Sequence, residues 1–378
     1  MEFALSREHE MLRDMVREFA EEVIAPRTEA FYAAQTLPDD VIEKITAQGL
    51  FGLMTSRDYG GSDMGHLASM IVLEELGKVC PSVGWLVMST LENTIVLGTY
   101  ASSHLKEKYL HRLARGEIKF CYGITEPAGG SDLRAMATTA EKVGEEYVIN
   151  GRKVFISWGH RADLCFVIAK TGEKYTVFLV EKDRPGFEVG HRENTMGLNA
   201  VPFSELIFHD CRVGAENILG SEGQGTRISL DLLTRMGRPA MAAFCLGIGE
   251  KALEIARKYS LERRLYGQPI ADLQAIQTYL AEMDVEVEAT RWLTYHMGWM
   301  LDNSDNRSQK NQATCRAKLF AQDMAARVCM KAMSILGGYG ITHEYRLTRL
   351  LADAMMIVPA AGTTEIMKVI LARELVSG

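Results

Sequence analysis

The chain has no long uninterrupted apolar segment. Its longest apolar block, Ala240 to Ile248, is flanked by Arg238 and Glu250, whereas a helix that spans a membrane needs about 20 mostly apolar residues. The first eight residues are charged and lack the apolar core of a secretory signal. The sequence therefore predicts a cytoplasmic protein without a membrane segment, and a buried helix around residues 240–248.

An excess of basic residues is also missing. The chain has 42 Lys and Arg against 49 Asp and Glu, which gives a net charge of −7 at pH 7. A surface that binds nucleic acid needs clustered positive charge, and no basic segment is appended to either end. We therefore expect no nucleic-acid partner.

Paired cysteines are absent as well. Seven cysteines occur singly along the chain, and none forms the CxxC spacing of a zinc site or a disulfide framework. They lie mostly among apolar neighbours, which is typical of buried, reduced thiols. The sequence predicts no metal site.

What the chain does contain is a change of periodicity. Its 378 residues are enough for two or three domains. Helical spacing extends to about residue 120, alternation with period two follows to about residue 225, and helical spacing returns in residues 226–378. The pair Asn150–Gly151 between two alternating runs predicts a hairpin turn, and Gly172 predicts a second one.

Five segments combine small and polar residues in ways that suit ligand binding. In Tyr122–Asp132, adjacent glycines next to Thr125 and Ser131 let backbone amides approach a ligand, although such a loop alone is more often structural. No strand precedes a GxGxxG pattern here, so the loop is not a Rossmann fingerprint. The other four segments are 155–157, 259–277, 335–341 and 353–366.

In this order, the five segments resemble the motifs of the FAD-dependent acyl-CoA dehydrogenases, and they cover essentially the whole chain. The resemblance implies a mainly α fold with a helical N-terminal domain (1–120), a central β-barrel domain (121–225) and a C-terminal four-helix bundle (226–378). It implies a homotetramer, built as a dimer of dimers, that binds FAD across subunit interfaces. It also implies an acyl-CoA substrate and an electron-transferring flavoprotein as the usual electron acceptor.

The resemblance assigns roles to individual residues. Phe155 stands where the family commonly has Trp against the isoalloxazine, and Arg263, in isolation an ordinary surface charge, would contact the FAD pyrophosphate of the adjacent subunit. The substrate contacts would be Ser131, Arg238 and Gly362. The full set of implied FAD contacts is Tyr122, Ile124, Thr125, Gly130, Ser131, Phe155, Ser157, Arg263, Tyr266, Gln274, Gly337, Gly338, Thr363 and Glu365.

The catalytic carboxylate of the family is missing. It usually stands immediately before Gly362, where this chain has Ala361, and a second position used by some members aligns without gaps with Gly237. The backbone N–H of Ala361 remains available to polarise a thioester carbonyl. General-base catalysis contributes roughly 10² to 10⁴ in rate, so we expect a replacement base elsewhere.

Glu92 is the candidate replacement. It lies in a stretch of apolar and small polar residues, Ser89 to Gly98, that aligns with the family's helix over the acyl group, and a carboxylate there is costly unless it is used or paired. This pattern resembles dehydrogenases of alicyclic thioesters such as cyclohex-1-ene-1-carboxyl-CoA, in which a vinylogous proton can be lost in a 1,4-elimination. A Glu92 paired with a surface Lys is an equally open interpretation. Glu365 and Asp353 are weaker candidates, because Glu365 should face the cofactor and Asp353 should pair with an arginine such as Arg349.

Three other interpretations of the sequence stay open. The chain is compatible with an ordinary dehydrogenase or enoyl reductase acting on acyl-CoA or an acyl-carrier-protein thioester. It is also compatible with a flavin-binding relative that has no turnover. Finally, Ala361 is compatible with a laboratory replacement of a native Glu.

Overall fold

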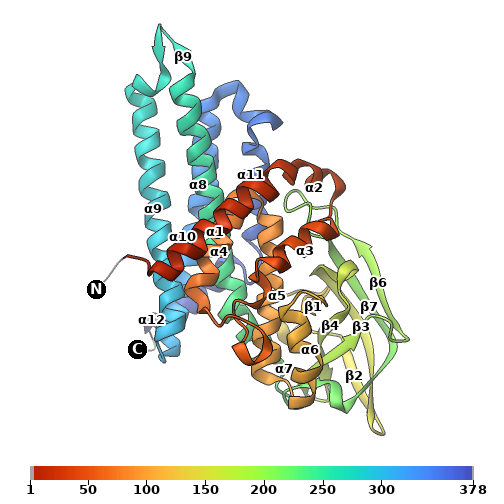
Figure 1. Ribbon diagram of the computed structural model, residues 1–378. Helices are drawn as coiled ribbons and strands as arrows, with labels where there is room; N and C mark the ends of the chain where they lie inside the picture. Colours follow the sequence, from red (N-terminus) through yellow and green to blue (C-terminus); the bar gives the residue numbers. More distant parts are fainter. Residues whose placement is uncertain (1–3, 377–378) are drawn as a thin grey trace.

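The chain folds as helices, then a β-sheet, then long helices (Figure 1). The computed structural model describes residues 4–376. Ser6 caps the first helix by accepting a hydrogen bond from the His9 N–H, and Leu12, Val16 and Phe19 form its buried face. The N-terminal helices are α1 (Arg7–Phe19), α2 (Thr28–Ala34), α3 (Asp39–Ala47), α4 (Gly65–Val79), α5 (Pro81–Tyr100) and α6 (Ser103–Ala114).

Helix α5 runs through the centre of the molecule, between the sheet and the long C-terminal helices (Figure 1). Pro81 stands in its first turn, where a missing N–H costs nothing, and nearly every residue up to Leu97 is buried. Despite this burial, no helix within residues 4–376 is long and apolar enough to cross a membrane.

The sheet follows as eight strands in the order β6–β7–β3–β2–β4–β5–β8, with β1 parallel to β4. Helices α5, α6 and α7 share a core with one face of this sheet, and a second core lies between its curled layers. The strands are β1 (Phe120–Gly123), β2 (Thr139–Val143), β3 (Glu146–Ser157), β4 (Leu164–Thr171), β5 (Lys174–Glu181), β6 (Phe187–Arg192), β7 (Phe203–Gly214) and β8 (Ile218–Leu219).

The expected closed β-barrel is wrong, because the sheet is open. Strands β6 and β8 are its two ends, and they do not pair with each other. With only two residues, β8 presents too short an edge to close the curled sheet. The sheet therefore encloses its inner core by curling, without completing a ring of hydrogen bonds.

The hairpin predicted at Asn150–Gly151 is also wrong. Both residues lie inside the single long strand β3, where the register to β7 shifts between Ile149 and Gly151. Gly151 takes φ +150°, and a Cβ there would lie 2.4 Å from Thr138 Oγ1, so the glycine serves a β-bulge rather than a turn. The turn that does join β2 to β3 is at Gly144, while the turn predicted at Gly172 is confirmed.

The C-terminal helices pack lengthwise, and helix α4 of the N-terminal region packs along α8 and α9. One continuous core joins the N-terminal helices to this group, and the predicted burial of residues 240–248 is confirmed. The C-terminal elements are α7 (Gly225–Leu232), α8 (Arg238–Glu262), the hairpin β9 (Arg264–Leu265) and β10 (Gln268–Pro269), α9 (Gln274–Asn303), α10 (Arg307–Leu336), α11 (Leu347–Ile357) and α12 (Thr364–Val376).

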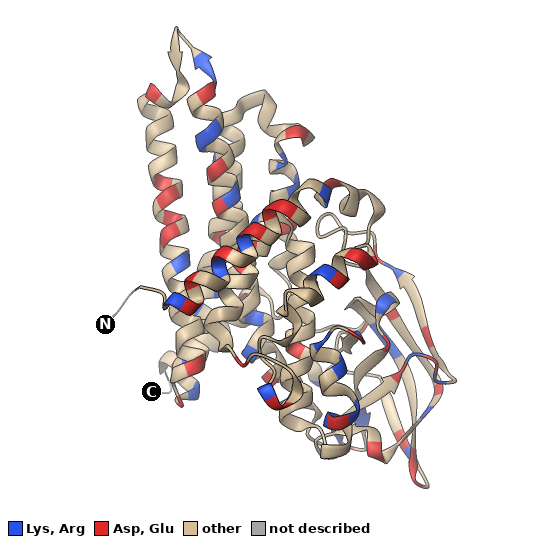
Figure 2. Cartoon of the chain, viewed as in Figure 1, with Lys and Arg blue, Asp and Glu red and all other residues tan. Residues whose placement is uncertain are grey.

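Surface charge is mixed in sign. Figure 2 shows acidic and basic residues interspersed along α1 and α8, mostly acidic ones along α9, and almost none on α5. The seven cysteines are all buried and unpaired, as expected.

Candidate active site

The structure brings Glu92, Gly237 and Ala361 to one point, although they are far apart in the sequence. A Cβ built on Gly237 would lie 2.6 Å from Glu92 Oε1 and 3.3 Å from the Ala361 Cβ. The two positions at which the family places its carboxylate therefore adjoin the one carboxylate that helix α5 supplies. The pairing of Glu92 with a surface lysine, left open by the sequence, does not occur within residues 4–376.

The Glu92 carboxylate has no partner. Within residues 4–376 it accepts no hydrogen bond and forms no ion pair, although part of the side chain is accessible. Burial alone raises the pKa of Glu92 to about 8, because taking a carboxylate out of water disfavours its charged form. A carboxyl group with a pKa in this range can exchange a proton near neutral pH.

A π-helical segment positions Gly237. Residues Leu233–Gly237 form a π-turn between α7 and α8, and the Leu233 side chain is also close to the Gly237 Cα. Such wide turns shift the residues on one side of a helix and are frequent at functional sites. Here the turn brings a residue without a side chain against Glu92.

The loop that contains Ala361 has unusual backbone geometry. Ala361 takes φ +55° and Gly362 φ +114°, and a positive φ is uncommon for a residue with a Cβ. Within the described chain, the N–H groups of both residues donate to no acceptor. The buried Arg238 donates from Nε to the Ala361 carbonyl oxygen at 3.2 Å. This arrangement leaves the Ala361 N–H free for a substrate oxygen.

The predicted flavin loop is docked on strand β3. The Val154 N–H donates to the Thr125 carbonyl oxygen at 2.9 Å. Next to this bond, the buried Lys153 Nζ donates to Glu126 Oε1 at 2.7 Å and to the Ile124 carbonyl oxygen at 3.3 Å. The Glu126 carboxylate also accepts from two backbone N–H groups, those of residues 137 and 138. This buried ion pair fixes the start of the loop that continues through Gly130 and Ser131.

Phe155 and Ser157 lie at the end of the same strand. A register shift between Lys153 and Ile156 gives Phe155 a φ of +57° and leaves its ring 58% exposed. Two residues on, Ser157 Oγ accepts a hydrogen bond from Trp85 Nε1 of α5 at 2.9 Å. Strand β3 is thereby tied to α5, the helix that carries Glu92.

Tyr122 lies on β1 and faces α7, where its hydroxyl is 3.3 Å from Ser229 Oγ. Burial raises the pKa of this phenol, to which the nearby Glu92 contributes. Tyr122 is thus close to the candidate base, and its contact with a cofactor stays a prediction.

A second group of predicted cofactor residues lies far from the first. Arg263 ends α8, Tyr266 is 92% exposed in the β9–β10 hairpin, and Gln274 begins α9. This hairpin is at the top of Figure 1, at the opposite end of the molecule from the sheet. Gly337 and Gly338, at the end of α10, are near it, since Tyr339 packs against Tyr259 of α8. One chain does not bring the two groups together.

The remaining acidic candidates do not suit a base. Glu365 is exposed at the start of α12, and its pKa is lowered by its own backbone N–H and by Thr363. Asp353 is buried, but it accepts hydrogen bonds from Tyr32 Oη and the Leu198 N–H, both at 2.6 Å. The expected pairing of Asp353 with Arg349 is wrong, because that arginine bonds Glu29 instead.

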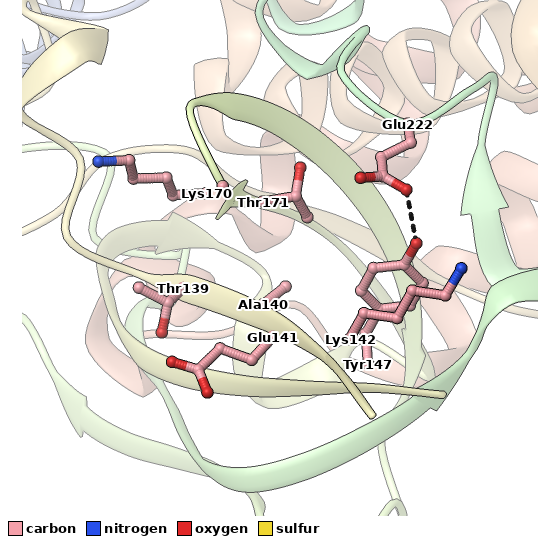
Figure 3. A pocket seen from close by; sticks show the side chains of 9 residues that line it. Thr139, Ala140, Glu141, Lys142, Tyr147, Lys170, Thr171 and Glu222 are labelled. Atoms are coloured by element: carbon pink, nitrogen blue, oxygen red, sulfur yellow. Dashed lines mark hydrogen bonds between the residues drawn. The ribbon is translucent and has the colours of Figure 1, made fainter. Parts of the chain in front are cut away.

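A surface hollow of about 400 Å³ lies on the sheet, away from these residues (Figure 3). It is lined mainly by polar side chains of β2 and β4, and Tyr147 Oη donates to Glu222 at 2.7 Å across one side. None of the residues predicted from the sequence lines this hollow. The candidate site is the point where Glu92, Gly237 and Ala361 meet.

Comparison with protein families decides the affiliation. Residues 6–117, 121–211 and 223–376 match the N-terminal, middle and C-terminal domains of acyl-CoA dehydrogenase, respectively. The chain belongs to the acyl-CoA dehydrogenase family. It is accordingly an oxidoreductase that uses FAD and acts on acyl-CoA.

Individual relatives are similar over their full length. The chain is 38% identical to an acryloyl-CoA reductase (NADH) of Anaerotignum propionicum, over 99% of this chain and 96% of that one. It is 37% identical to a cyclohex-1-ene-1-carbonyl-CoA dehydrogenase of Syntrophus aciditrophicus (strain SB), over 98% of this chain and 90% of that one. The solved butyryl-CoA dehydrogenase of Megasphaera elsdenii has a TM-score of 0.95 at 31% identity, with 100% of both chains covered.

The residues present fit a flavin. Phe155, at the bulge near the end of strand β3, offers an exposed aromatic face. A Cβ on Gly338 would meet no heavy atom within 4 Å, so packing inside the chain does not require a glycine there. A ligand that lies against the backbone would account for a glycine at this position.

The sequence did not identify four residues of the site. They are Lys153, Glu126, Trp85 and Lys318, whose Nζ donates to the carbonyl oxygens of Ala360 and Gly362. The sequence could have indicated that Lys318 is buried, since it stands on the otherwise apolar face of a helical pattern, between Ala317 and Ala321. Lys153 had no such signal, because an alternating strand commonly carries Lys on its exposed side.

Proposed function

We propose that this protein dehydrogenates a cyclic, conjugated acyl-CoA such as cyclohex-1-ene-1-carboxyl-CoA, with Glu92 as the base. The observation that carries the proposal is the position of the unpaired Glu92 carboxylate against Gly237 and Ala361. A thioester held at the Ala361 N–H places its acyl group under α5, and Glu92 is then the one carboxylate at that point.

In the proposed reaction, Ala361 and Glu92 have separate roles. The Ala361 N–H donates a hydrogen bond to the thioester oxygen, which acidifies carbons conjugated with the carbonyl. Glu92 takes the vinylogous ring proton, and its C–H electron pair forms a double bond to the neighbouring ring carbon. The electron pair of the existing ring double bond shifts at the same time toward the carbon that loses the hydride. FAD, when bound, would supply the acceptor for the hydride that leaves the opposite ring carbon. The products are a cyclic diene thioester, a protonated Glu92 and reduced flavin, so atoms and electrons balance.

Small residues at the site are compatible with a ring-shaped acyl group. A base on α5 approaches the substrate from a helix, whereas a base at Ala361 would approach from the loop between α11 and α12. Gly237, Ala360 and Ala361 supply no bulk at this point. Sequence identity does not choose the substrate, since relatives named for acryloyl-CoA and for cyclohex-1-ene-1-carbonyl-CoA are about equally similar.

The assembly is part of the same proposal. We expect a homotetramer in which Arg263, Tyr266 and Gln274 of one subunit complete the FAD site of another. An electron-transferring flavoprotein is the expected acceptor of the electrons.

The test is anaerobic mixing of the holoenzyme with thioesters while the visible flavin band is followed. Cyclohex-1-ene-1-carboxyl-CoA should bleach the wild type, and Glu92→Gln should slow bleaching by at least about 10²-fold. Glu43→Gln, a change at an exposed carboxylate of α3, is the matched control and should bleach normally. Equal bleaching by butyryl-CoA, unaffected by Glu92→Gln, would reject the proposal.

A further inference from the structure

Two buried cations hold the loop that carries Ala361. The Lys318 Nζ of α10 donates to the carbonyl oxygens of Ala360 and Gly362, and the Arg238 Nε of α8 donates to the carbonyl oxygen between them. Lys318 is fully buried and Arg238 is 7% exposed. Three consecutive carbonyls of one loop are therefore bound by two positive side chains.

Neither cation has an anionic partner. Within residues 4–376 Lys318 and Arg238 form no ion pair, and the ionisable groups near Lys318 are Arg238, Cys245 and Cys315. Burying a cation without a carboxylate is costly, and two adjacent cations repel one another. Other buried lysines of the chain do have carboxylate partners: Lys78 pairs with Glu250 and Glu254, and Lys153 pairs with Glu126.

The geometry of a trans peptide explains how the bonds from Lys318 affect the Ala361 N–H. The described chain contains no cis peptide, so the C=O of Ala360 and the N–H of Ala361 point in opposite directions. When Lys318 binds that C=O from the core side, the N–H is aimed away from the core. A positive charge on the carbonyl oxygen also polarises the peptide, which makes its N–H a stronger donor. The same bonds hold Ala361 in its unfavourable positive-φ conformation.

We infer that Lys318, assisted by Arg238, is a positioning residue that aims and polarises the Ala361 N–H toward the thioester oxygen. The inference rests on the proposed function in one respect, that a thioester oxygen binds at this N–H. It adds that the strength of this hydrogen bond depends on a charge located on the far side of the peptide.

The experiment measures the hydrogen bond directly. Benzoyl-CoA carrying ¹³C at its carbonyl has a ring-shaped acyl group and cannot be dehydrogenated, so it can be bound to the holoenzyme without turnover. Isotope-edited infrared difference spectra then give the C=O stretching frequency of the bound thioester. We expect a shift to lower frequency in the wild type and loss of most of that shift in Lys318→Met.

Kinetics separate positioning from binding. Lys318→Met should lower kcat with the cyclohexene thioester by about 10²-fold, the effect of losing one oxyanion donor, while KM changes little. Lys318→Gln keeps one donor and should fall between the wild type and Lys318→Met in both readouts, and it serves if the methionine variant does not fold. Lys78→Met removes another buried lysine as a matched control, and should lower thermal stability without moving the C=O frequency.

Each outcome decides something. An unchanged C=O shift in folded Lys318→Met or Lys318→Gln would overturn the inference and leave the proposed function intact. A wild type that binds benzoyl-CoA with no shift at all would overturn both, because no donor would then act on the carbonyl.

Discussion

Glu92 is a buried carboxylate that forms no ion pair within residues 4–376. Burial raises its pKa to about 8, whereas the ordinary value is 4.5. The folded state therefore favours the protonated form, and stability present below pH 4.5 is lost as the pH rises through about 8. A buried carboxylate without a partner destabilises the folded state at neutral pH. Its presence at the centre of the fold indicates that Glu92 is retained for chemistry rather than for stability.

The first prediction is the pH dependence of catalysis. A base must be ionised to accept a proton, so kcat/KM should rise with unit slope below the pKa of Glu92 and level off above about pH 8. Between pH 6 and pH 9 we expect a rise of roughly 50- to 100-fold, measured by steady-state assay with an artificial electron acceptor. Glu92→Gln should show a low, flat profile. A wild-type profile that is already flat at pH 6 would contradict the assignment.

The second prediction concerns Gly237. A Cβ at this position lies 2.6 Å from Glu92 Oε1, so Gly237→Ala must displace the carboxylate. A displacement of about 1 Å of a catalytic group can cost on the order of 10²-fold in kcat. Gly98→Ala on α5 is the control, because its Cβ meets only Leu110 at an ordinary 3.8 Å.

The two glycine variants should differ in activity and not in folding. Gly98→Ala should keep full turnover and gain about 0.5–1 kcal/mol, the usual advantage of alanine inside a helix. If Gly237→Ala keeps wild-type kcat, the Glu92 carboxylate is not held where the reaction needs it. Thermal denaturation of both variants shows whether a loss of turnover is a loss of fold.

At the scale of elements, strand β3 links the flavin loop to helix α5. Lys153 binds Glu126 of the loop from the C-terminal half of this strand, and Ser157, at the end of the same strand, bonds Trp85. Burial lowers the pKa of Lys153 to about 8 even beside a carboxylate. The strand thus sets the distance between the residues predicted to hold the flavin and the base on α5.

The third prediction tests that link. Lys153→Met leaves the Glu126 carboxylate buried and unpaired, and such losses cost about 3–5 kcal/mol. We expect a lower melting temperature and a lower ratio of flavin to protein after gel filtration. Arg152→Met next to it removes an ion pair with Glu205 in which the arginine is half exposed, and should cost less than about 1 kcal/mol with full flavin content. Equal effects of the two variants would show that the buried pair does not hold the loop.

These elements also show how far the sequence leads. Helical periodicity predicted the helices, and an apolar stretch interrupted by Glu92 predicted the one unpaired carboxylate at the site. The hairpin turn predicted at Asn150–Gly151 was wrong, because a β-bulge and a turn both favour a glycine. Only the pairing of β3 with β7 distinguishes the two. The contacts of Lys318 depend on how α10 meets a loop more than 40 residues away along the chain, which no local pattern encodes.

At the scale of the whole molecule, the predicted FAD contacts form two separated groups. One lies around β3 and α5, and the other lies at the β9–β10 hairpin and the end of α10. Exposed apolar side chains follow one side of α9, with Val285 67% and Trp299 51% exposed. Large apolar side chains at this exposure mark an interaction surface, which supports the proposed assembly of several copies.

The last prediction uses this separation. Glu92→Gln removes the base but keeps an intact hairpin, whereas Arg263→Glu keeps the base but weakens the hairpin that would hold the FAD of a neighbouring subunit. Each variant alone should be nearly inactive. If FAD sites are shared between two chains, co-expression creates some sites that combine an intact base from one chain with an intact hairpin from the other. For random pairing within two-fold dimers, these restored sites are roughly a quarter of all sites.

Two affinity tags on the two variants allow the mixed oligomers to be isolated, and turnover per flavin measures the restored sites. Co-expression of Glu92→Gln with the double variant Glu92→Gln/Arg263→Glu is the matched control, since neither chain then supplies a base. Mixed oligomers without activity would contradict shared sites and would require Arg263 to act within its own chain. That outcome conflicts with the position of Arg263 at the far tip of the α8–α9 pair, so the restored activity is the expected result.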